Sequence, residues 1–584
     1  MKDFLKMFGA VLLAFAVISL LPFLFLIAIV GSIDTESVAV QPGSVLTINL
    51  DESIYDSPRM PSLGMGGSSS FEMVNSLSVL DVSKALEAAA EDDNIKALYL
   101  HFTGVGMIEG TAQIEELRGE LLAFKERSGK PIVAYNETYS QGTYWLSSVA
   151  DEIYLHPQGG LDWRGLASQV LFYKGAIDKL GVDVQIVRHG TYKSAVEPYM
   201  LTQMSPANRR QTEAMVNSLW SAIVSDIAAS REISAEKLQR YAAELAVASP
   251  ADALSLGLVD GLKYEDEVVA RLEELSDSDE LTEITLGEYS TTVVPTKISR
   301  NKVAIIYADG QIIDGEGGEG IVGGATTAEQ VRRAREDESV KAVVLRVNSP
   351  GGSALASDVM WRELKLLGEK KPLVVSMSNY AASGGYYISA PAGHIVANRT
   401  TLTGSIGVFG LIVSGKDVLE DKLGVSVDVA KTAPHADMGT MFRPLSATEM
   451  AFMQRSVEDV YTTFVGRVAE GRKMAPEAVN AIGEGRVWSG VDAQRIGLVN
   501  EFGGLRRAVE IAAERAELGD DWRLVEILEE GSELSALLNS LFMARAPRLS
   551  GQMGTAAKEL EQISREIENG SSVLARMPYH ITIY

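Results

Sequence analysis

The sequence predicts an α/β protein made of two similar domains in tandem. Strand-like apolar runs alternate with helical segments, which is typical of βαβ units with mostly parallel strands. The sequence also repeats itself. The run Glu91–Leu100 (EDDNIKALYL) returns as Glu336–Leu345 (EDESVKAVVL), and Lys179–Val182 (KLGV) returns as Lys422–Val425. The offset of about 240 residues is too long for a solenoid and suits a duplicated domain.

An apolar segment precedes the duplicated part. Residues Met7–Ile33 carry no charge, which is long enough for one transmembrane helix. Lys2 and Lys6 precede this segment, so the positive-inside tendency places the N-terminus in the cytoplasm. We expect a retained anchor rather than a cleaved signal peptide, because the run exceeds a usual signal-peptide core and no clear cleavage site follows. The soluble part would then lie outside the cytoplasm.

The chain is expected to divide into five parts. Residues 1–43 are the cytoplasmic N-terminus, transmembrane helix and a short linker; 44–290 and 302–530 are the two repeats, 291–301 a linker and 531–584 a helical tail. In each repeat three runs are expected to form strands in the same order: Val45–Leu50, Ala97–Phe102 and Ile132–Asn136, then Val303–Tyr307, Ala342–Val347 and Leu373–Met377. The glycine-rich stretches Met60–Ser70 and Asp314–Gly324 are expected to be flexible loops.

Composition excludes several classes of function. The chain of 584 residues has no cysteine, which rules out disulfides, thiolate catalysis and cysteine-ligated metals. A net charge of −25 argues against nucleic acid as a partner. The six histidines are scattered without metal-ligand spacing, so we expect no metal, and no motif indicates a cofactor.

The two copies differ where chemistry is expected. The second has Ser383, followed by Gly384 and Gly385, at the end of an apolar strand; the first has Gln141 where the serine would be. A serine at a strand-to-helix turn exposes its hydroxyl, and the amide of Gly384 at the helix start favours a developing oxyanion. The alternative, that Ser383 only caps a helix, fits the local sequence equally well.

A second oxyanion donor is expected one strand earlier. The segment Asn348–Ser353 (NSPGGS) forms a tight turn after the apolar run Val343–Val347. Its glycines, Gly351 and Gly352, bring backbone amides toward the same end of the sheet as Ser383.

The serine needs a base, and two residues are candidates. His394 lies in a strand-like context, where a structural histidine is more common than a catalytic one. Lys193 has small and apolar neighbours, and the matching position in the second copy is Ala436. A lysine acts as a base only when neutral, which requires its pKa of about 10.4 to fall by roughly 3 units, a shift that burial can supply. Because most isolated lysines are solvated, the residues alone leave the base open.

Two motifs resemble a known peptidase family. The run Tyr192–Pro198 (YKSAVEP), followed by Met204–Pro206, closely resembles the lysine motif of the long, duplicated form of signal peptide peptidase A, or protease IV. The runs Tyr380–Tyr387 (YAASGGYY) and Leu402–Gly407 (LTGSIG) are similar to its serine block. The resemblance spans roughly residues 1–530, and two motifs in the family's order and spacing are specific.

The resemblance implies a fold and a site. Each repeat is expected to have the Clp-protease/crotonase-like fold, with a transmembrane helix before them. In that family the serine, here Ser383, is the nucleophile, and the lysine of the other repeat, here Lys193, is the general base. The serine of the LTGSIG motif, here Ser405, helps to orient the lysine. The family assembles as a homotetramer, which we expect here as well.

We therefore expect a membrane-anchored serine endopeptidase with a Ser-Lys dyad. It would sit in the bacterial inner membrane with its catalytic part on the periplasmic side and degrade hydrophobic peptides such as cleaved signal peptides. One alternative is a crotonase-like acyl-CoA enzyme, since fold does not fix function; the extracytoplasmic placement and the lack of a basic patch argue against it. Another is a non-catalytic envelope scaffold.

Overall fold

The computed structural model describes residues 39–59, 62–65, 71–74, 76–104, 106–293, 298–528 and 574–576. The predicted transmembrane segment and most of the predicted helical tail lie outside these residues. Among the helices in the described ranges, none combines the length and the apolar character needed to cross a bilayer. The chain divides into a unit Met1–Gln41 and a unit Pro42–Tyr584, and the elements below belong to the second unit.

The first repeat is built on a six-stranded parallel sheet in the order β10-β8-β7-β6-β1-β11. Its central strands are nearly continuous apolar runs, as expected where helices cover both faces of a sheet. The three strands predicted in this repeat are confirmed. The bounds are β1 (Ser44–Ile48), β6 (Ile95–Leu100), β7 (Ile132–Tyr139), β8 (Glu152–Leu161), β10 (Gly261–Leu262) and β11 (Glu283–Thr285).

The second repeat has a sheet of the same design. Its order is β21-β19-β17-β15-β12-β23, with β18 pairing β17 and β22, and all pairs are parallel except β19 with β21. The predicted strands are again confirmed. The bounds are β12 (Lys302–Asp309), β15 (Val340–Ser349), β17 (Leu373–Ala382), β18 (His394–Ala397), β19 (Leu402–Gly404), β21 (Val487–Ser489), β22 (Glu501–Phe502) and β23 (Arg523–Glu526).

The helices correspond between the repeats as well. The longest in each repeat, α7 (Pro206–Arg231) and α15 (Ala447–Arg472), both have 26 residues and both follow a serine N-cap. In each repeat a buried tyrosine after the serine-like turn donates its hydroxyl to a leucine carbonyl: Tyr144 to Leu258 and Tyr386 to Leu498. The duplication predicted from sequence is therefore present in the fold.

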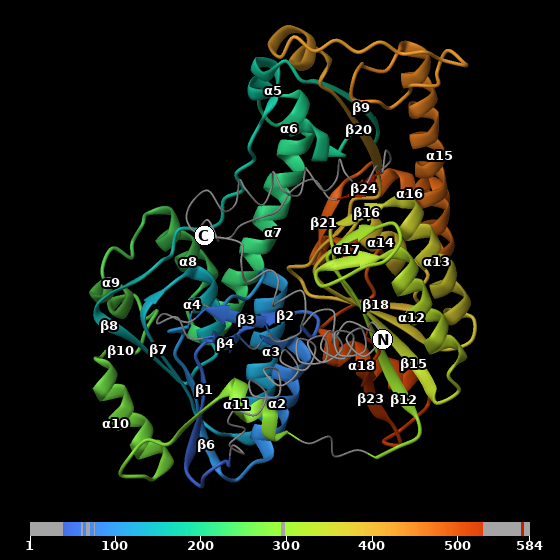
Figure 1. Ribbon diagram of the computed structural model, residues 1–584. Helices are drawn as coiled ribbons and strands as arrows, with labels where there is room; N and C mark the ends of the chain where they lie inside the picture. Colours follow the sequence, from blue (N-terminus) through green and yellow to red (C-terminus); the bar gives the residue numbers. More distant parts are fainter. Residues whose placement is uncertain are drawn as a thin grey trace, which may run out of the picture. The chain divides into compact units, whose positions relative to one another are not determined.

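Most of the other helices flank the two sheets, whereas α5 and α6 lie at the top of the view near β9 and β20 (Figure 1). Those of the first repeat are α2 (Val79–Glu91), α3 (Thr111–Ser128), α4 (Gln141–Ser147), α5 (Lys174–Leu180), α6 (Glu197–Met200), α8 (Ala235–Ala243), α9 (Pro250–Ser255), α10 (Glu265–Ser276) and α11 (Leu286–Thr292). Those of the second are α12 (Gly324–Glu336), α13 (Ala354–Gly368), α14 (Gly384–Ser389), α16 (Pro476–Ile482), α17 (Gly490–Arg495) and α18 (Leu505–Arg515).

A third sheet combines strands from both repeats, in the order β14-β13-β16-β24-β20-β9. In it β9 of the first repeat pairs antiparallel with β20 of the second, from His189 opposite Val408 to Asp183 opposite Ser414. The bounds are β9 (Asp183–His189), β13 (Gln311–Ile313), β14 (Ile321–Gly323), β16 (Gly351–Ser353), β20 (Val408–Ser414) and β24 (Leu574–Arg576). The β9–β20 pair brings the lysine motif of one repeat to the serine motif of the other.

Both glycine-rich stretches that we expected to be loops contain strands. Within Met60–Ser70, β3 (Ser62–Met65) pairs antiparallel with β4 (Phe71–Val74), and β14 lies within Asp314–Gly324. The expectation was wrong for these residues because strand pairing uses backbone groups, which glycine also provides. A further short pair joins β2 (Ser53–Tyr55) to β5 (Ser76–Ser78).

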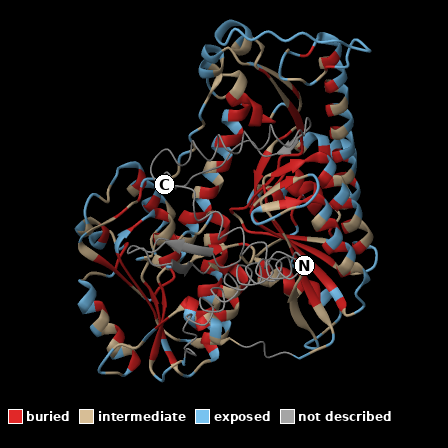
Figure 2. Ribbon diagram, in the orientation of Figure 1, coloured by how far each residue is buried: buried red, intermediate tan, exposed pale blue. Residues whose placement is uncertain are grey.

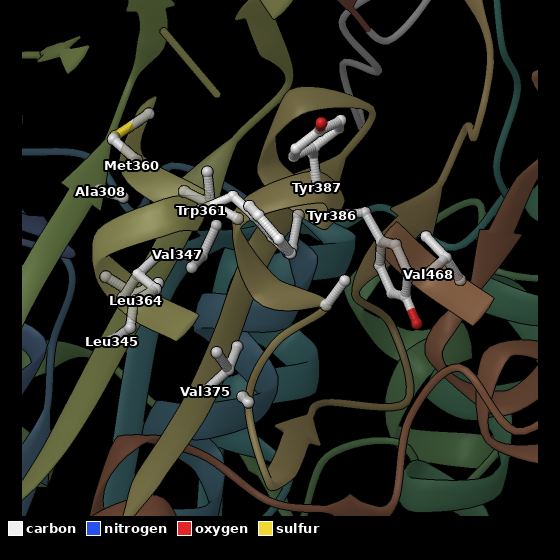
Figure 3. Close-up of a cluster of buried hydrophobic side chains, with 14 of the residues drawn as sticks. Ala308, Leu345, Val347, Met360, Trp361, Leu364, Val375, Tyr386, Tyr387 and Val468 are labelled. Carbon is white, nitrogen blue, oxygen red and sulfur yellow. The ribbon is translucent and has the colours of Figure 1, made fainter. Parts of the chain in front are cut away.

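The core that supports the serine turn lies on one face of the second sheet. The sheets of both repeats are buried, whereas the surrounding helices expose their outer faces (Figure 2). In the largest cluster Trp361 and Leu364 of α13 pack with Val347 of β15 and with Tyr386 and Tyr387 of α14 (Figure 3). The two tyrosines lie three and four residues after Ser383, so this core fixes the helix that Ser383 precedes.

Acidic residues of α3 join the first repeat to arginines of the second. The three pairs are Glu115 with Arg399 (2.6 Å), Glu116 with Arg346 (2.8 Å) and Glu120 with Arg506 (3.0 Å). Arg346 is fully buried and also pairs with Asp56 of the first repeat. Taking Arg346 and its two carboxylate partners out of water is costly, so their pairing favours one arrangement of the two repeats.

Candidate active site

Ser383 lies at a strained turn between β17 and α14. Its backbone has φ 56° and ψ −114°, a region that residues other than glycine seldom occupy and that is found most often at functional sites. Its N–H donates to the carbonyl of Gly404 at 2.8 Å. The side chain does not cap α14 by a hydrogen bond, unlike Ser205 and Ser446, which cap their helices. The hydroxyl of Ser383 is therefore not used for helix capping.

Lys193 reaches this hydroxyl from the other repeat. Its side chain is fully buried, and its Nζ lies 2.8 Å from Oγ of Ser383. The same Nζ donates to Oγ of Ser405 at 3.0 Å and to the Ser405 carbonyl at 3.2 Å. The structure thus brings together the three side chains proposed from sequence as nucleophile, base and orienting serine.

Burial controls the charge of this lysine. Nζ contacts two hydroxyls and a carbonyl and forms no ion pair within the described part of the chain. Removal from water disfavours the ammonium form and lowers the pKa of Lys193 well below its usual value. An amine whose pKa is lowered in this way provides a lone pair that can accept a proton near neutral pH.

Two glycines make room for the lysine. A Cβ on Gly485 would lie 2.6 Å from Cβ of Lys193, and one on Gly407 would lie 3.2 Å from its Cδ. Gly485 also has φ +80°, and its N–H donates to Ile406 at 2.7 Å. Gly485 was not predicted from the sequence. The run Gly483–Glu484–Gly485 indicates a turn, but nothing in it indicates that Lys193 packs against that turn.

Ser405 is held in place by the same segment. Its backbone has φ 49°, its N–H donates to Arg486 at 2.7 Å, and its hydroxyl donates to the Gly485 carbonyl at 3.3 Å. With its proton directed at that carbonyl, the Oγ lone pairs face Nζ of Lys193. Ser405 therefore accepts a hydrogen bond from the lysine and fixes where its nitrogen lies.

Gln211 of α7 supports the lysine motif from outside the dyad. Its buried amide donates to the carbonyl of Tyr192 at 3.1 Å and to the hydroxyl of Ser194 at 2.8 Å, on either side of Lys193. Its oxygen accepts from the N–H of Val487 in the second repeat at 3.3 Å. Sequence reasoning did not find Gln211, because nothing local marks a buried amide on a long helix as part of a site.

The predicted oxyanion glycines lie on two turns that pack against each other, one of which carries Ser383. Gly384 is the first residue of α14, where first-turn N–H groups have no partner within the helix. Gly351 and Gly352 begin β16, and a Cβ on Gly385 would lie 2.6 Å from the carbonyl of Ser349, so the two turns pack closely. The N–H of Gly351 donates to Oγ of Ser349 at 3.1 Å, and Gly352 pairs with Ile312 and Ala575 within the third sheet.

Three further residues in or near these motifs have partners outside the dyad. Ser353 caps α13 and donates to Asp314 at 2.5 Å. His394 contacts Arg515 at 3.1 Å and lies beside Glu501, with no contact to Ser383. In the first repeat the side-chain amide of Gln141 donates to the carbonyl of Gly165, and its oxygen accepts from the N–H groups of Arg164 and Gly165.

One group of carboxylates among the described residues has the spacing of a metal site: Asp56, Glu109 and Asp309. Arg59 lies 3.4 Å from Glu109 and 3.8 Å from Asp309, so a guanidinium already balances part of their charge. Burial raises the pKa of Glu109 to about 7, which further lowers the group's negative charge at neutral pH. This set does not include the dyad, and we assign no metal to it.

Both repeats are similar to a known peptidase family. The model of peptidase family S49 matches residues 124–279 and 365–519, once in each repeat. The chain is 39% identical over 516 residues to a protein named Protease 4 from Salmonella typhi, covering 85% of this chain and 82% of that one. It is 37% identical to Protease 4 of Haemophilus influenzae, and the match covers 75% of this chain and 72% of that protein. It is 32% identical to the chloroplastic serine protease SPPA of Arabidopsis thaliana, and the match covers 86% of this chain and 74% of that protein.

Proposed function

The chain belongs to peptidase family S49 as a long, duplicated serine peptidase, and from this premise we propose that it is a membrane-anchored endopeptidase with a Ser-Lys dyad that degrades hydrophobic peptides. The observation that carries the proposal is the contact of 2.8 Å between Nζ of Lys193 and Oγ of Ser383, in a site where the lysine is fully buried. A neutral amine at this distance is within reach of the hydroxyl proton.

The reaction follows from the positions of these atoms. Lys193 accepts the proton of Ser383 as Oγ attacks the peptide carbonyl and forms a tetrahedral intermediate. The lysine ammonium then gives that proton to the leaving amine, and an acyl-enzyme on Ser383 remains. Water attacks the ester with Lys193 again as base, which releases the acid and restores the serine. The amide of Gly384 and those near Gly351 and Gly352 hold the oxyanion in both steps.

Apolar surroundings support a hydrophobic substrate. Ala195 and Val196, which follow Lys193, pack against Phe409 at the start of β20. On the other side, Ala382 packs with Leu402 and Val487. Remnant signal peptides have this character, and an N-terminal anchor in the bacterial inner membrane would place a periplasmic catalytic part beside them.

Exposed segments of both repeats support assembly with further copies. Inside the chain, β20 pairs with β9. The repeat offset makes residues 426–432 the counterpart of β9 and residues 166–172 the counterpart of β20. Neither segment forms a strand here. They expose apolar side chains such as Leu171, Val427 and Val429. Pairing segment 426–432 of one copy with 166–172 of the next is a head-to-tail contact, which closes into a ring when the rotation allows it. A homotetramer is the ring that the family resemblance implies.

The direct test compares Ser383→Ala with the unaltered full chain on a fluorogenic hydrophobic peptide, in detergent. We expect a loss of about 10,000-fold or more in kcat, because the nucleophile and its base act as a unit. Ser456→Ala is the control, since that hydroxyl contacts only a carbonyl of its own helix. Activity of Ser383→Ala within a factor of a few of the unaltered chain would contradict the proposal and direct attention to Ser349, Ser353 or Ser405.

A further inference from the structure

Glu197, the first residue of α6, is a buried acidic side chain that takes no part in the dyad. It lies four residues after Lys193 and is 1% exposed. Its Oε2 accepts from the N–H of Ser205 at 3.1 Å and from Nδ2 of Asn208 at 2.9 Å, and no cation pairs with it among the described residues. The N-terminus of α7 offsets part of the cost of this burial. Buried charges in proteins are usually paired, so a carboxylate held only by neutral donors requires an explanation.

The carboxylate of Glu197 determines which way the amide of Asn208 points. A carboxylate oxygen only accepts hydrogen bonds, so the NH2 group of Asn208 has to face it. The carbonyl oxygen of that amide then points the other way. There it accepts from Nε2 of Gln211 at 3.2 Å and from the hydroxyl of Thr212 at 3.3 Å. The orientation of one amide therefore determines the orientation of the next.

The amide of Gln211 passes this orientation to both repeats. With its NH2 group toward Asn208, its nitrogen donates to the groups on either side of Lys193, and its oxygen accepts from the N–H of Val487. In the flipped orientation its oxygen would face the carbonyl of Tyr192, and its NH2 group would face the N–H of Val487. Both contacts would be lost and the buried groups left without partners, which is costly.

The row of amides ends on the segment that lines the lysine. Val487 lies two residues after Gly485, where an added Cβ would lie 2.6 Å from Cβ of Lys193. Lys193 and Ser383 belong to different repeats, so a change in how these segments meet moves Nζ relative to Oγ. A misplacement of about 1 Å at a reacting group lowers the rate by about 100-fold.

We propose that Glu197 is a positioning residue for the base: its carboxylate orients the amides of Asn208 and Gln211, which hold the lysine segment against the second repeat with Nζ beside Oγ of Ser383. This inference rests on the proposed peptidase function, which it deepens by naming the group that fixes the base. The carboxylate is suited to this role because both of its oxygens accept. A glutamine amide has one accepting end and one donating end, so it does not fix the direction.

The first test reverses the polarity of the contact between Glu197 and Asn208 in the full chain. Asn208→Asp sets two accepting groups against each other, and Glu197→Gln removes the fixed direction, so kcat on a short hydrophobic peptide should fall about 100-fold and about tenfold, with KM unchanged. In the double variant Glu197→Gln/Asn208→Asp the amide at 197 donates to the carboxylate at 208, and kcat should return to within about threefold of the unaltered chain. Asn217→Asp is the control, since Asn217 is an exposed residue of the same helix.

The second test locates Nζ without relying on activity. In crystal structures of the full chain, the Nζ–Oγ distance should stay near 2.8 Å in the unaltered protein and in the double variant. It should lengthen by about 1 Å or more in Asn208→Asp. If Asn208→Asp does not fold, the comparison is made with Glu197→Gln, which introduces no repulsion and should also lengthen the distance.

The two tests separate this inference from the proposed function. Equal distances in all variants, or a double variant no more active than Asn208→Asp, would overturn the positioning role even if the protein is an active peptidase. A distance that lengthens in the single variants and is restored in the double variant, without peptidase activity in any form, would support the positioning role and contradict the proposed function.

Discussion

Lys193 is the residue whose chemistry depends most on its surroundings. Exposed, it would be an ammonium and could not accept a proton. Here it is fully buried among hydroxyls, a carbonyl and the bare backbone of Gly485, and burial alone lowers its pKa. The sequence presents the same residue with small and apolar neighbours, which permits such burial without requiring it.

The pH dependence of activity follows from this lowered pKa. Below the lowered pKa Lys193 is protonated and cannot act as base, so kcat/KM should rise as pH increases through that pKa and then level off. Lys193→Arg should be inactive across the range, because a guanidinium remains charged. The measurement is a pH profile of kcat/KM for both proteins. Substantial activity of Lys193→Arg near neutral pH would show that the residue supplies only positive charge.

Ser405 provides an internal check on the same profile. Its hydroxyl accepts a hydrogen bond from Nζ at 3.0 Å, and such an acceptor favours the ammonium form. Ser405→Ala should therefore move the acid limb of the profile to lower pH while reducing kcat, because the nitrogen is less well positioned. An acid limb at the same pH in both proteins would show that Ser405 does not affect the pKa of Lys193.

At the scale of elements, the turn between α16 and β21 determines whether the lysine fits. Gly485→Ala adds a Cβ that would lie 2.6 Å from Cβ of Lys193, at φ +80°. Gly497→Ala is a matched control, because Gly497 has φ +82° and nothing within 4 Å of the added atom. Both variants incur a backbone cost of about 1–2 kcal/mol in the left-handed region. Only Gly485→Ala should lose peptidase activity, measured as kcat on a short peptide.

The contact of α3 with the second repeat gives another prediction. Arg346→Met removes the cation that pairs with the buried Asp56 and Glu116, and should lower the free energy of unfolding by about 3–5 kcal/mol. Arg332→Met is the control, since its pairs with Glu329 and Glu363 lie at the surface. Denaturant unfolding followed by circular dichroism compares the two. Equal, small effects would mean that the buried pairs do not hold the repeats together.

At the scale of the whole molecule, the active site exists only because both repeats contribute to it. The serine, its glycines and Ser405 come from the second repeat, and the lysine and Gln211 come from the first. Antiparallel pairing of β9 with β20 and the pairs on α3 bring them together. Each repeat therefore carries one member of the dyad, and the first has Gln141 in place of the serine.

Assembly with other copies is tested on the segment that exposes Val427. Val427→Lys should reduce the molecular mass found by light scattering in detergent, because the charge opposes strand pairing across copies. Val491→Lys is the control: Val491 is exposed to 39% and Val427 to 42%, but Val491 lies on α17, away from the segment 426–432. A mass that Val427→Lys leaves unchanged would contradict the head-to-tail contact.

The sequence by itself determined the repeat, the order of the strands and the residue types able to do the chemistry. Periodicity and local motifs are encoded in neighbouring residues, so the strands at residues 132–136 and 373–377 and the motifs around Lys193 and Ser383 could be recognised along the chain. The tertiary structure decided what depends on distant contacts. The 2.8 Å contact of the dyad, the space left by Gly485, the support from Gln211 and the place of β24 each join segments far apart in the sequence. Such contacts follow from how the two repeats pack, and burial, which sets the charge of Lys193, belongs to the packed molecule rather than to any segment of it.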